Sequence, residues 1–150
     1  MKKIQNQSIK KYNKLDPSLE KLYDKAYDAY LNSYSPYSKF KVGAAVLLKS
    51  GEIITGTNIE NSSYGLTICA ERCALFNTYS QGYRKFDIDK LMIIGNTEAP
   101  ISPCGACRQV IFELMNENCD VVLTNLYKDI KVMKVKELIP YAFNEDLKNE

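Results

Sequence analysis

The chain has 150 residues, of which 45% are apolar, so it is long enough to build one self-sufficient core. The chain contains 20 basic and 18 acidic residues, but the charges are unevenly distributed. Five lysines and a single acid lie within residues 1–16, so the remainder has 15 basic and 17 acidic residues. This balance argues against a polynucleotide ligand, because nucleic-acid binders usually present a basic face, and the lack of any run of about 18 apolar residues argues against a membrane span.

Residues 1–16 are expected to form a basic, flexible extension ahead of a single domain at residues 17–150. The extension lacks the apolar run of a secretory signal, and its lysines could at most make a weak nucleic-acid contact. Five cysteines, an odd number, fit reduced thiols better than a disulfide framework. We therefore expect a cytoplasmic protein.

The first half of the domain predicts one helix followed by two strands. Asp16 and Pro17 have the residue types of an N-cap and a first helical position, and that helix should end near residues 32–33, before Pro36. Residues 40–48 are apolar on both alternating faces, which is typical of a strand buried on both sides. After a turn at 50–51, residues 52–57 should return as a second strand.

The second half predicts a helix from about Cys69 to near Gly82, a strand at 91–94, and a helix that begins near Cys104. Strands at 121–123 and 130–135 follow, and a short helix at 135–139 ends the order. Only residues 124–129 separate these last two strands, which is too short for a crossover helix, so they should pair as an antiparallel hairpin. The fold class is therefore α/β, with three layers (α/β/α) around a five-stranded mixed sheet.

Three cysteines and one glutamate are the most informative residues, because the chain contains no histidine. Cys104 and Cys107 have the C-x-x-C spacing of metal sites, and Cys69 would be a third soft ligand for zinc. Three protein ligands leave a fourth tetrahedral position open, as in catalytic zinc sites. Glu71 is then a candidate proton shuttle.

The expected helix starts would favour such a site. Positive helix ends lower the pKa of thiolates and absorb part of their charge, and Arg72 could donate hydrogen bonds to sulfur. Other interpretations stay open at this point. The C-x-x-C pair alone could be a redox pair or half of a structural zinc site, Cys73 could be a fourth ligand or a core residue, and Cys119 is expected in the core.

The chain resembles the zinc-dependent nucleobase deaminases, whose ligands are one His or Cys plus two Cys, with a catalytic Glu. A cysteine at the first ligand position narrows the resemblance to the small, three-cysteine cytidine deaminases. It extends over roughly residues 17–147 and rests on the stretches 34–40 (YSPYSKF), 42–45 (VGAA), 58–61 (NIEN), 69–72 (CAER), 102–109 (SPCGACRQ) and 142–143 (AF).

The resemblance implies hydrolytic deamination of cytidine and deoxycytidine to uridine and deoxyuridine, a step of pyrimidine salvage. One zinc ion per subunit would be held by Cys69, Cys104 and Cys107. A water activated by the zinc would attack C4 of the base, while Glu71 passes protons to N3 and to the departing amine.

The resemblance also implies roles for substrate-binding residues and a homotetramer with shared active sites. Phe40 would pack on the base, Asn58 and Glu60 would bind the ribose hydroxyls, and Tyr64 would lie near the substrate. The backbone of Ala70 and Ser102 would read the base edge, and Phe143 would reach an adjacent subunit's site. Tyr141 stands where relatives often carry glycine.

Some of these residues could have purely structural roles, and functions other than cytidine deamination are also compatible with the sequence. Phe40 could be strand core, Asn58 and Glu60 could be turn residues, and Arg72 could be a surface cation. The rivals are a deaminase of a related cytosine nucleoside, such as a nucleoside antibiotic, and a non-catalytic structural zinc module. A nucleotide deaminase is disfavoured, because the carboxylate of Glu60 would repel a phosphate. The resemblance adds that nucleotide-acting relatives usually place a helix between the last two strands, and residues 124–129 are too short for one.

Overall fold

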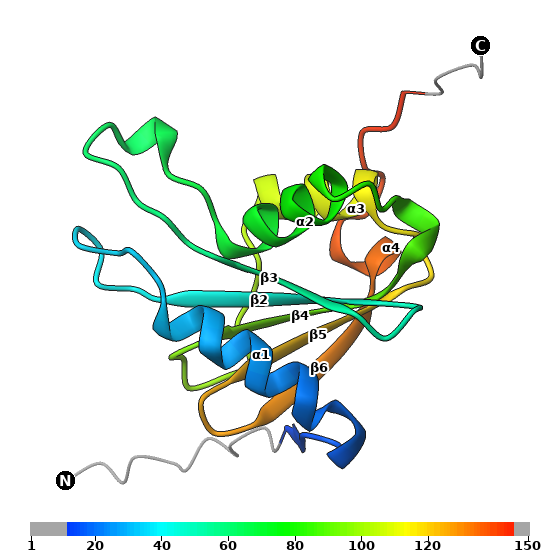
Figure 1. The fold of residues 1–150 in the computed structure, drawn as a ribbon, viewed down its shortest axis with the longest axis horizontal. Coiled ribbons are helices and arrows are strands. Elements are labelled where there is room, and N and C mark those ends of the chain that lie inside the picture. Colours follow the sequence, from blue (N-terminus) through cyan, green and yellow to red (C-terminus); the bar gives the residue numbers. More distant parts are fainter. Residues whose placement is uncertain (1–11, 146–150) are drawn as a thin grey trace, which may run out of the picture.

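One mixed sheet with strand order β1-β6-β5-β4-β2-β3 forms the centre of the molecule, and helices cover both of its faces (Figure 1). The computed structural model describes residues 12–145. The strands are β1 (Asn13–Lys14), β2 (Val42–Leu48), β3 (Ile53–Thr57), β4 (Ile88–Gly95), β5 (Asp120–Asn125) and β6 (Asp129–Lys134). The α-helices are α1 (Glu20–Leu31), α2 (Ala70–Ser80), α3 (Gly105–Leu114) and α4 (Val135–Leu138), with 3-10 turns at Pro17–Leu19, Tyr64–Leu66 and Lys85–Asp87.

The predicted α/β class, the three layers and the antiparallel β5–β6 hairpin are confirmed, and the five predicted strands are all present. β4 and β5 are parallel, and the other neighbouring strands are antiparallel.

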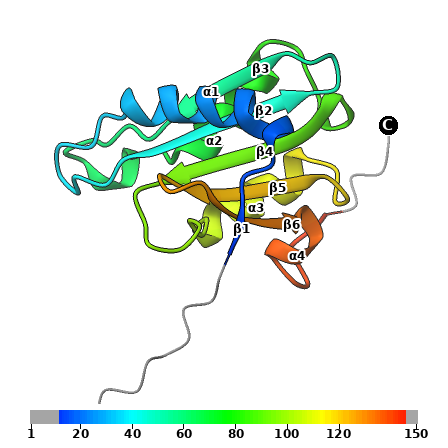
Figure 2. The same ribbon diagram turned by 90° about the horizontal axis from the view of Figure 1, so that it is seen from below.

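The strand count of five was wrong by one, because the end of the N-terminal extension adds β1 at the edge of the sheet (Figure 2). Asn13 pairs with Ile130 and Lys14 with Asp129, and the Lys14 ammonium lies 2.5 Å from the Asp129 carboxylate. Two exposed polar residues carry no hydrophobic alternation, so the sequence pattern gave no sign of this strand. The extension was expected to be flexible. Most of it, residues 1–11, lies outside the described part of the chain, so that expectation stays a prediction.

Alternate residues of the central strands feed two separate cores. In β4, Leu91 and Ile93 pack toward the side of α2 and α3, whereas Met92 and Ile94 pack toward α1. Figure 1 shows the same division, with α1 on one face of the sheet and α2, α3 and α4 on the other. The strand that the sequence pattern predicted to be buried on both faces at residues 40–48, observed as β2, is therefore covered by a core on each side.

Two glycines allow the helices to approach the sheet closely. A Cβ added to Gly43 in β2 would lie 2.1 Å from the carbonyl oxygen of Ala26 in α1. A Cβ added to Gly56 in β3 would lie 2.2 Å from the backbone nitrogen of Ala74 in α2. Gly56 therefore determines how near α2 lies to the sheet.

Among residues 12–145, no helix is both long enough and apolar enough to cross a bilayer.

Candidate functional site

The first turns of α2 and α3 bring three sulfur atoms together. Cys69 is the N-cap residue of α2, Cys104 is the N-cap residue of α3, and Cys107 lies in the first turn of α3. Their Sγ atoms all lie within 4.8 Å of one another. The helix starts predicted from the sequence thus place these residues at the ends where positive backbone charge favours thiolates.

The other two cysteines lie outside this group. Cys73 is not among the clustered ligand atoms, and Cys119 donates its thiol to the carbonyl of Ile88 at 3.4 Å. Within the described residues the group therefore has three sulfurs, and the interpretation as a closed four-cysteine structural site finds no fourth ligand.

Within the cysteine group, the surroundings of Cys69 favour its thiolate form. Hydrogen bonds from Cys107 and Arg72 lower the pKa of Cys69 to about 5. The pKa of Cys107 is raised, because its thiol donates to Cys69 and because it is buried. A guanidinium nitrogen of Arg72 lies 3.5 Å from the Cys69 sulfur, and this contact raises the pKa of the arginine. Arg72 is therefore a partner of the sulfurs rather than a simple surface cation.

Glu71 follows Cys69 by two residues and is almost completely buried, with 4% of its surface exposed. Burial, and to a smaller extent the negative charge of Cys69, raises the pKa of Glu71 to about 7. A carboxyl group poised near neutral pH can both accept and donate a proton, which is what general acid–base catalysis requires. The buried position also distinguishes Glu71 from an ordinary acid in a first helical turn.

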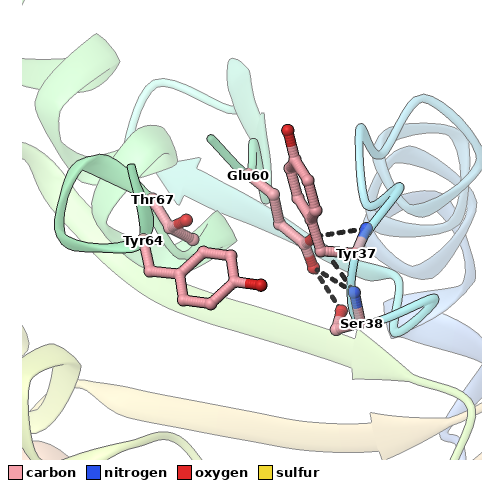
Figure 3. A pocket seen from close by; sticks show the side chains of 5 residues that line it. All are labelled: Tyr37, Ser38, Glu60, Tyr64 and Thr67. Carbon is pink, nitrogen blue, oxygen red and sulfur yellow. Dashed lines mark hydrogen bonds between the residues drawn. The ribbon is translucent and has the colours of Figure 1, made fainter. Parts of the chain in front are cut away.

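A cavity of about 240 Å³ opens onto these groups at the end of the sheet where β2 begins and β4 ends. It is lined by Ser38, Phe40, Val42, Asn58, Glu60, Thr67, Ile68, Cys69, Glu71, Ile101, Ser102 and Cys104. An outer cavity of about 410 Å³ shares three of these residues and is lined by Tyr37, Ser38, Glu60, Tyr64 and Thr67 (Figure 3).

The structure therefore gathers most of the predicted substrate-binding residues, but not all. Phe40, Asn58, Glu60 and Ser102 line the inner cavity, and Tyr64 lines only the outer one. Two predicted residues line neither cavity. Ala70 is fully buried at the start of α2, and Phe143 is 74% exposed, with its carbonyl accepting a hydrogen bond from the Gln109 amide at 2.9 Å.

Asn58 and Glu60 hold the loop before β2 as well as facing the cavity. The Asn58 amide accepts from the Val42 backbone N–H at 2.9 Å and donates to the Phe40 carbonyl at 2.8 Å. The Glu60 carboxylate accepts from the backbone N–H groups of Tyr37 and Ser38. The interpretation as turn residues and the interpretation as ligand-binding residues are therefore both compatible with these positions.

Sequence reasoning missed Arg108, which fixes the loop that carries Ser102 and Cys104. Its guanidinium donates to the Pro103 carbonyl at 2.9 Å, to the Ser102 hydroxyl at 2.7 Å and to the Leu138 carbonyl at 2.6 Å. One signal was available. A cation is unfavourable near the start of a helix, so an arginine placed there needs a specific partner.

The C-terminal segment has an unusual backbone at Tyr141, the position where glycine was expected from the resemblance. Its φ is +50°, in the left-handed region that residues with a side chain rarely adopt, and its ring is fully exposed. The segment thus keeps the backbone shape that glycine favours, although the residue is a tyrosine.

The donor set fits zinc. Three sulfur ligands suit this metal, and three protein ligands leave the fourth tetrahedral position free, as in catalytic sites. Two helix N-termini and Arg72 offset the negative charge of the thiolates.

Comparison with known proteins agrees with this geometry. Residues 17–123 match the family described as "Cytidine and deoxycytidylate deaminase zinc-binding region". A cytidine deaminase of Halalkalibacterium halodurans is 49% identical over 129 residues, which cover 86% of this chain and 96% of the relative. A blasticidin-S deaminase of Bacillus cereus is 31% identical over 115 residues, covering 73% and 81% of the two chains.

A crystal structure of cytidine deaminase from Burkholderia pseudomallei superposes with a TM-score of 0.81 at 46% identity, covering 83% of this chain and 98% of that one. The cofactor is zinc, bound by the three clustered cysteines. The fold, the three-sulfur group and these matches together show that this chain belongs to the zinc-binding cytidine and deoxycytidylate deaminase family.

Proposed function

We propose that this protein converts cytidine and deoxycytidine to uridine and deoxyuridine with release of ammonia. One observation carries the proposal. The buried Glu71 and the three-sulfur group meet at the wall of a cavity that also contains an aromatic ring and polar groups suited to a nucleoside. In the reaction the bond between C4 and the amino nitrogen breaks and a bond between C4 and a water oxygen forms.

Glu71 supplies the proton transfers. When bound, zinc supplies the Lewis acidity that lowers the pKa of water at the open coordination position. A carboxylate oxygen of Glu71 accepts a proton from the attacking water and delivers it to N3 of the base. It then accepts the second proton, from the new hydroxyl at C4, and delivers it to the departing amine, so that the C4 carbonyl forms and ammonia leaves. Burial, the largest cause, raises the pKa of Glu71, which favours a carboxyl group that can hold a proton between the two transfers.

The remaining residues of the cavity would orient a nucleoside without a phosphate. Phe40 would pack on the base, the amide of Asn58 and the carboxylate of Glu60 would bind sugar hydroxyls, and the backbone at Ala70 and Ser102 would read the base edge. The described lining of both cavities includes the Glu60 carboxylate and neither lysine nor arginine. A 5′-phosphate beside Glu60 would therefore meet the negative charge of its carboxylate, and the nearby cation, Lys39, has the smallest of the influences that lower the pKa of Glu60.

An ultraviolet assay of the purified protein with cytidine, deoxycytidine, CMP and adenosine tests this proposal. We expect turnover of the first two only, and loss of most of the rate in Glu71→Ala with zinc retained. Equal cytidine turnover by wild type and Glu71→Ala would contradict the role of Glu71. Turnover of CMP without turnover of cytidine would contradict the substrate.

A second candidate is a cytosine nucleoside antibiotic, and the 31% identity to a blasticidin-S deaminase favours it. Blasticidin S in the same assay separates the two candidates. We expect cytidine to be turned over faster, because the identity to the cytidine deaminase relative is higher.

We also propose that the protein acts as a homotetramer in the cytoplasm, with active sites shared between subunits. The supporting observation is that Phe143 and Tyr64 are each 74% exposed, although both are expected near substrate. Reduced thiols, which the zinc group requires, are maintained in that compartment. Mixing inactive Glu71→Ala and Phe143→Ala proteins should restore activity if one subunit's Phe143 serves another's site.

A further inference from the structure

The carboxylate of Glu60 is held by one short turn of the chain, residues 37–40. Backbone N–H groups of Tyr37 and Ser38 donate to one carboxylate oxygen at 2.9 and 3.1 Å, and the Ser38 hydroxyl donates to the other. Figure 3 shows these bonds converging on Glu60 from the turn that carries Tyr37 and Ser38. Only 9% of Glu60 is exposed, so its direction in the cavity is determined by these three donors.

The Ser38 hydroxyl has a second contact, with the residue expected to pack on the base. Its oxygen accepts a hydrogen bond from the backbone N–H of Phe40 at 3.0 Å. One hydroxyl thus bonds the sugar-binding candidate Glu60 on one side and the base-binding candidate Phe40 on the other. All three residues line the same cavity.

The bond from the Phe40 N–H to the Ser38 hydroxyl spans Lys39, a residue with a strained backbone. Lys39 has a φ of +60°, in the left-handed region that is unfavourable for a residue with a side chain. Its backbone N–H donates to the Ser35 carbonyl at 3.0 Å, which holds the start of the turn. The bond from Phe40 to the Ser38 hydroxyl closes the turn across this strained residue.

Loss of the hydroxyl would leave most of the fold intact. The two backbone donors to Glu60 would remain, and the Phe40 N–H would lose one hydrogen bond, to the Ser38 hydroxyl. What would be lost is the fixed spacing between the ring of Phe40 and the carboxylate of Glu60. The lost spacing acts on the recognition of substrate, separately from the stability that the bond to Glu60 contributes.

We propose that Ser38 is a positioning residue. Its hydroxyl holds the base-packing ring of Phe40 at a fixed distance from the sugar-binding carboxylate of Glu60. It thereby determines how strongly the affinity for a nucleoside depends on the hydroxyls of the sugar. The inference rests on the proposed function, which gives Phe40 and Glu60 these roles. The hydrogen bonds of Ser38 join it to Glu60 and Phe40 and not to Glu71 or the cysteine group, so we expect the chemical step itself to be unaffected.

The test compares Ser38→Ala, Ser38→Thr and the control Ser80→Ala, whose exposed serine lies at the far end of α2. In Ser38→Ala we expect KM for cytidine to rise about tenfold, with kcat within about twofold of wild type, as for loss of a hydrogen bond to a charged group. Ser38→Thr keeps the hydroxyl and should restore KM. Ser80→Ala should match wild type.

A second substrate isolates the sugar. 2′,3′-Dideoxycytidine lacks the 2′ and 3′ hydroxyls and keeps the 5′ hydroxyl, so Ser38→Ala should lower the preference for cytidine over this analogue by about the same tenfold factor. In a Glu60→Ala background, Ser38→Ala should change KM by no more than about twofold, because the two act as a unit.

The outcomes separate this inference from the proposed function. If wild type does not turn over cytidine, the proposed function is wrong and this role of Ser38 falls with it. If wild type is active, an unchanged KM in a folded Ser38→Ala protein would overturn the inference alone. A full tenfold loss in the Glu60→Ala background, or a threonine variant as impaired as the alanine variant, would do the same.

Discussion

Replacing Gly56 by alanine should damage the active site from the opposite side of helix α2. The added Cβ would lie 2.2 Å from the Ala74 nitrogen and 2.7 Å from the Ala70 carbonyl oxygen, both backbone atoms that cannot rotate away. An ordinary contact begins at 3.4 Å, so α2 must move by roughly 1 Å. Ala70 lies between Cys69 and Glu71, and a misplacement of about 1 Å in a catalytic group can cost about 100-fold in rate.

Gly43→Ala is a matched control, because it clashes as severely with α1, which carries none of the proposed catalytic residues or zinc ligands. Both variants should lose about 1–3 kcal/mol of stability. At about 2–4 °C per kcal/mol for a chain of this size, both should show a clear fall in Tm.

The assay measures Tm, zinc content and cytidine turnover for both variants. Gly56→Ala should lose about 100-fold in kcat per bound zinc, whereas Gly43→Ala should keep kcat within about threefold of wild type. Equal kcat values for Gly56→Ala and Gly43→Ala proteins that are equally destabilised would show that Gly56 does not determine the position of Cys69 and Glu71 at the start of α2.

Four further outcomes are expected. Arg72→Ala should lower turnover or zinc affinity about 10–100-fold, whereas Arg84→Ala should not, because Arg84 follows the far end of α2 and lies over the ring of Tyr79. Chelation of zinc should abolish turnover and lower Tm, and stoichiometric zinc should restore both; retained activity in metal-free protein would contradict the site. Tyr141→Gly should raise stability by relieving the left-handed strain, whereas Tyr141→Ala should not. Hydrogen bonding, chiefly from Ser38, lowers the pKa of Glu60, so the stability it contributes is present above the ordinary carboxyl pKa and is lost as pH falls through the lowered value. The Tm difference between wild type and Glu60→Gln should therefore shrink from pH 6 toward pH 3.

The zinc group could be predicted from the sequence because its determinants are local. Cys104 and Cys107 are one helical turn apart, and Cys69 and Glu71 lie at a helix start that the sequence pattern itself indicates. Once both helices start at these residues and pack on the same side of the sheet, the sulfurs can meet.

The supporting contacts could not be predicted, because they join residues far apart in the chain. The bond from Arg108 to Leu138 spans 30 residues, and the bond from Ser38 to Glu60 spans 22. Periodicity and capping rules describe neighbours within a few positions and are silent about such pairs. The resemblance identified the segments but not the bonds between them, and strand β1 was missed for lack of any apolar pattern.

The short strand β1 also bears on the behaviour of the protein at high concentration. An uncovered strand at the edge of a sheet is a template on which other chains can pair and aggregate. β1 covers β6 only opposite Asp129 and Ile130, and the exposed Val132 lies beyond it, directly after Lys131 and two residues before Lys134. Those charges and the added strand together discourage sheet-to-sheet association, so a truncated chain that starts at Pro17 should precipitate more readily than the full one.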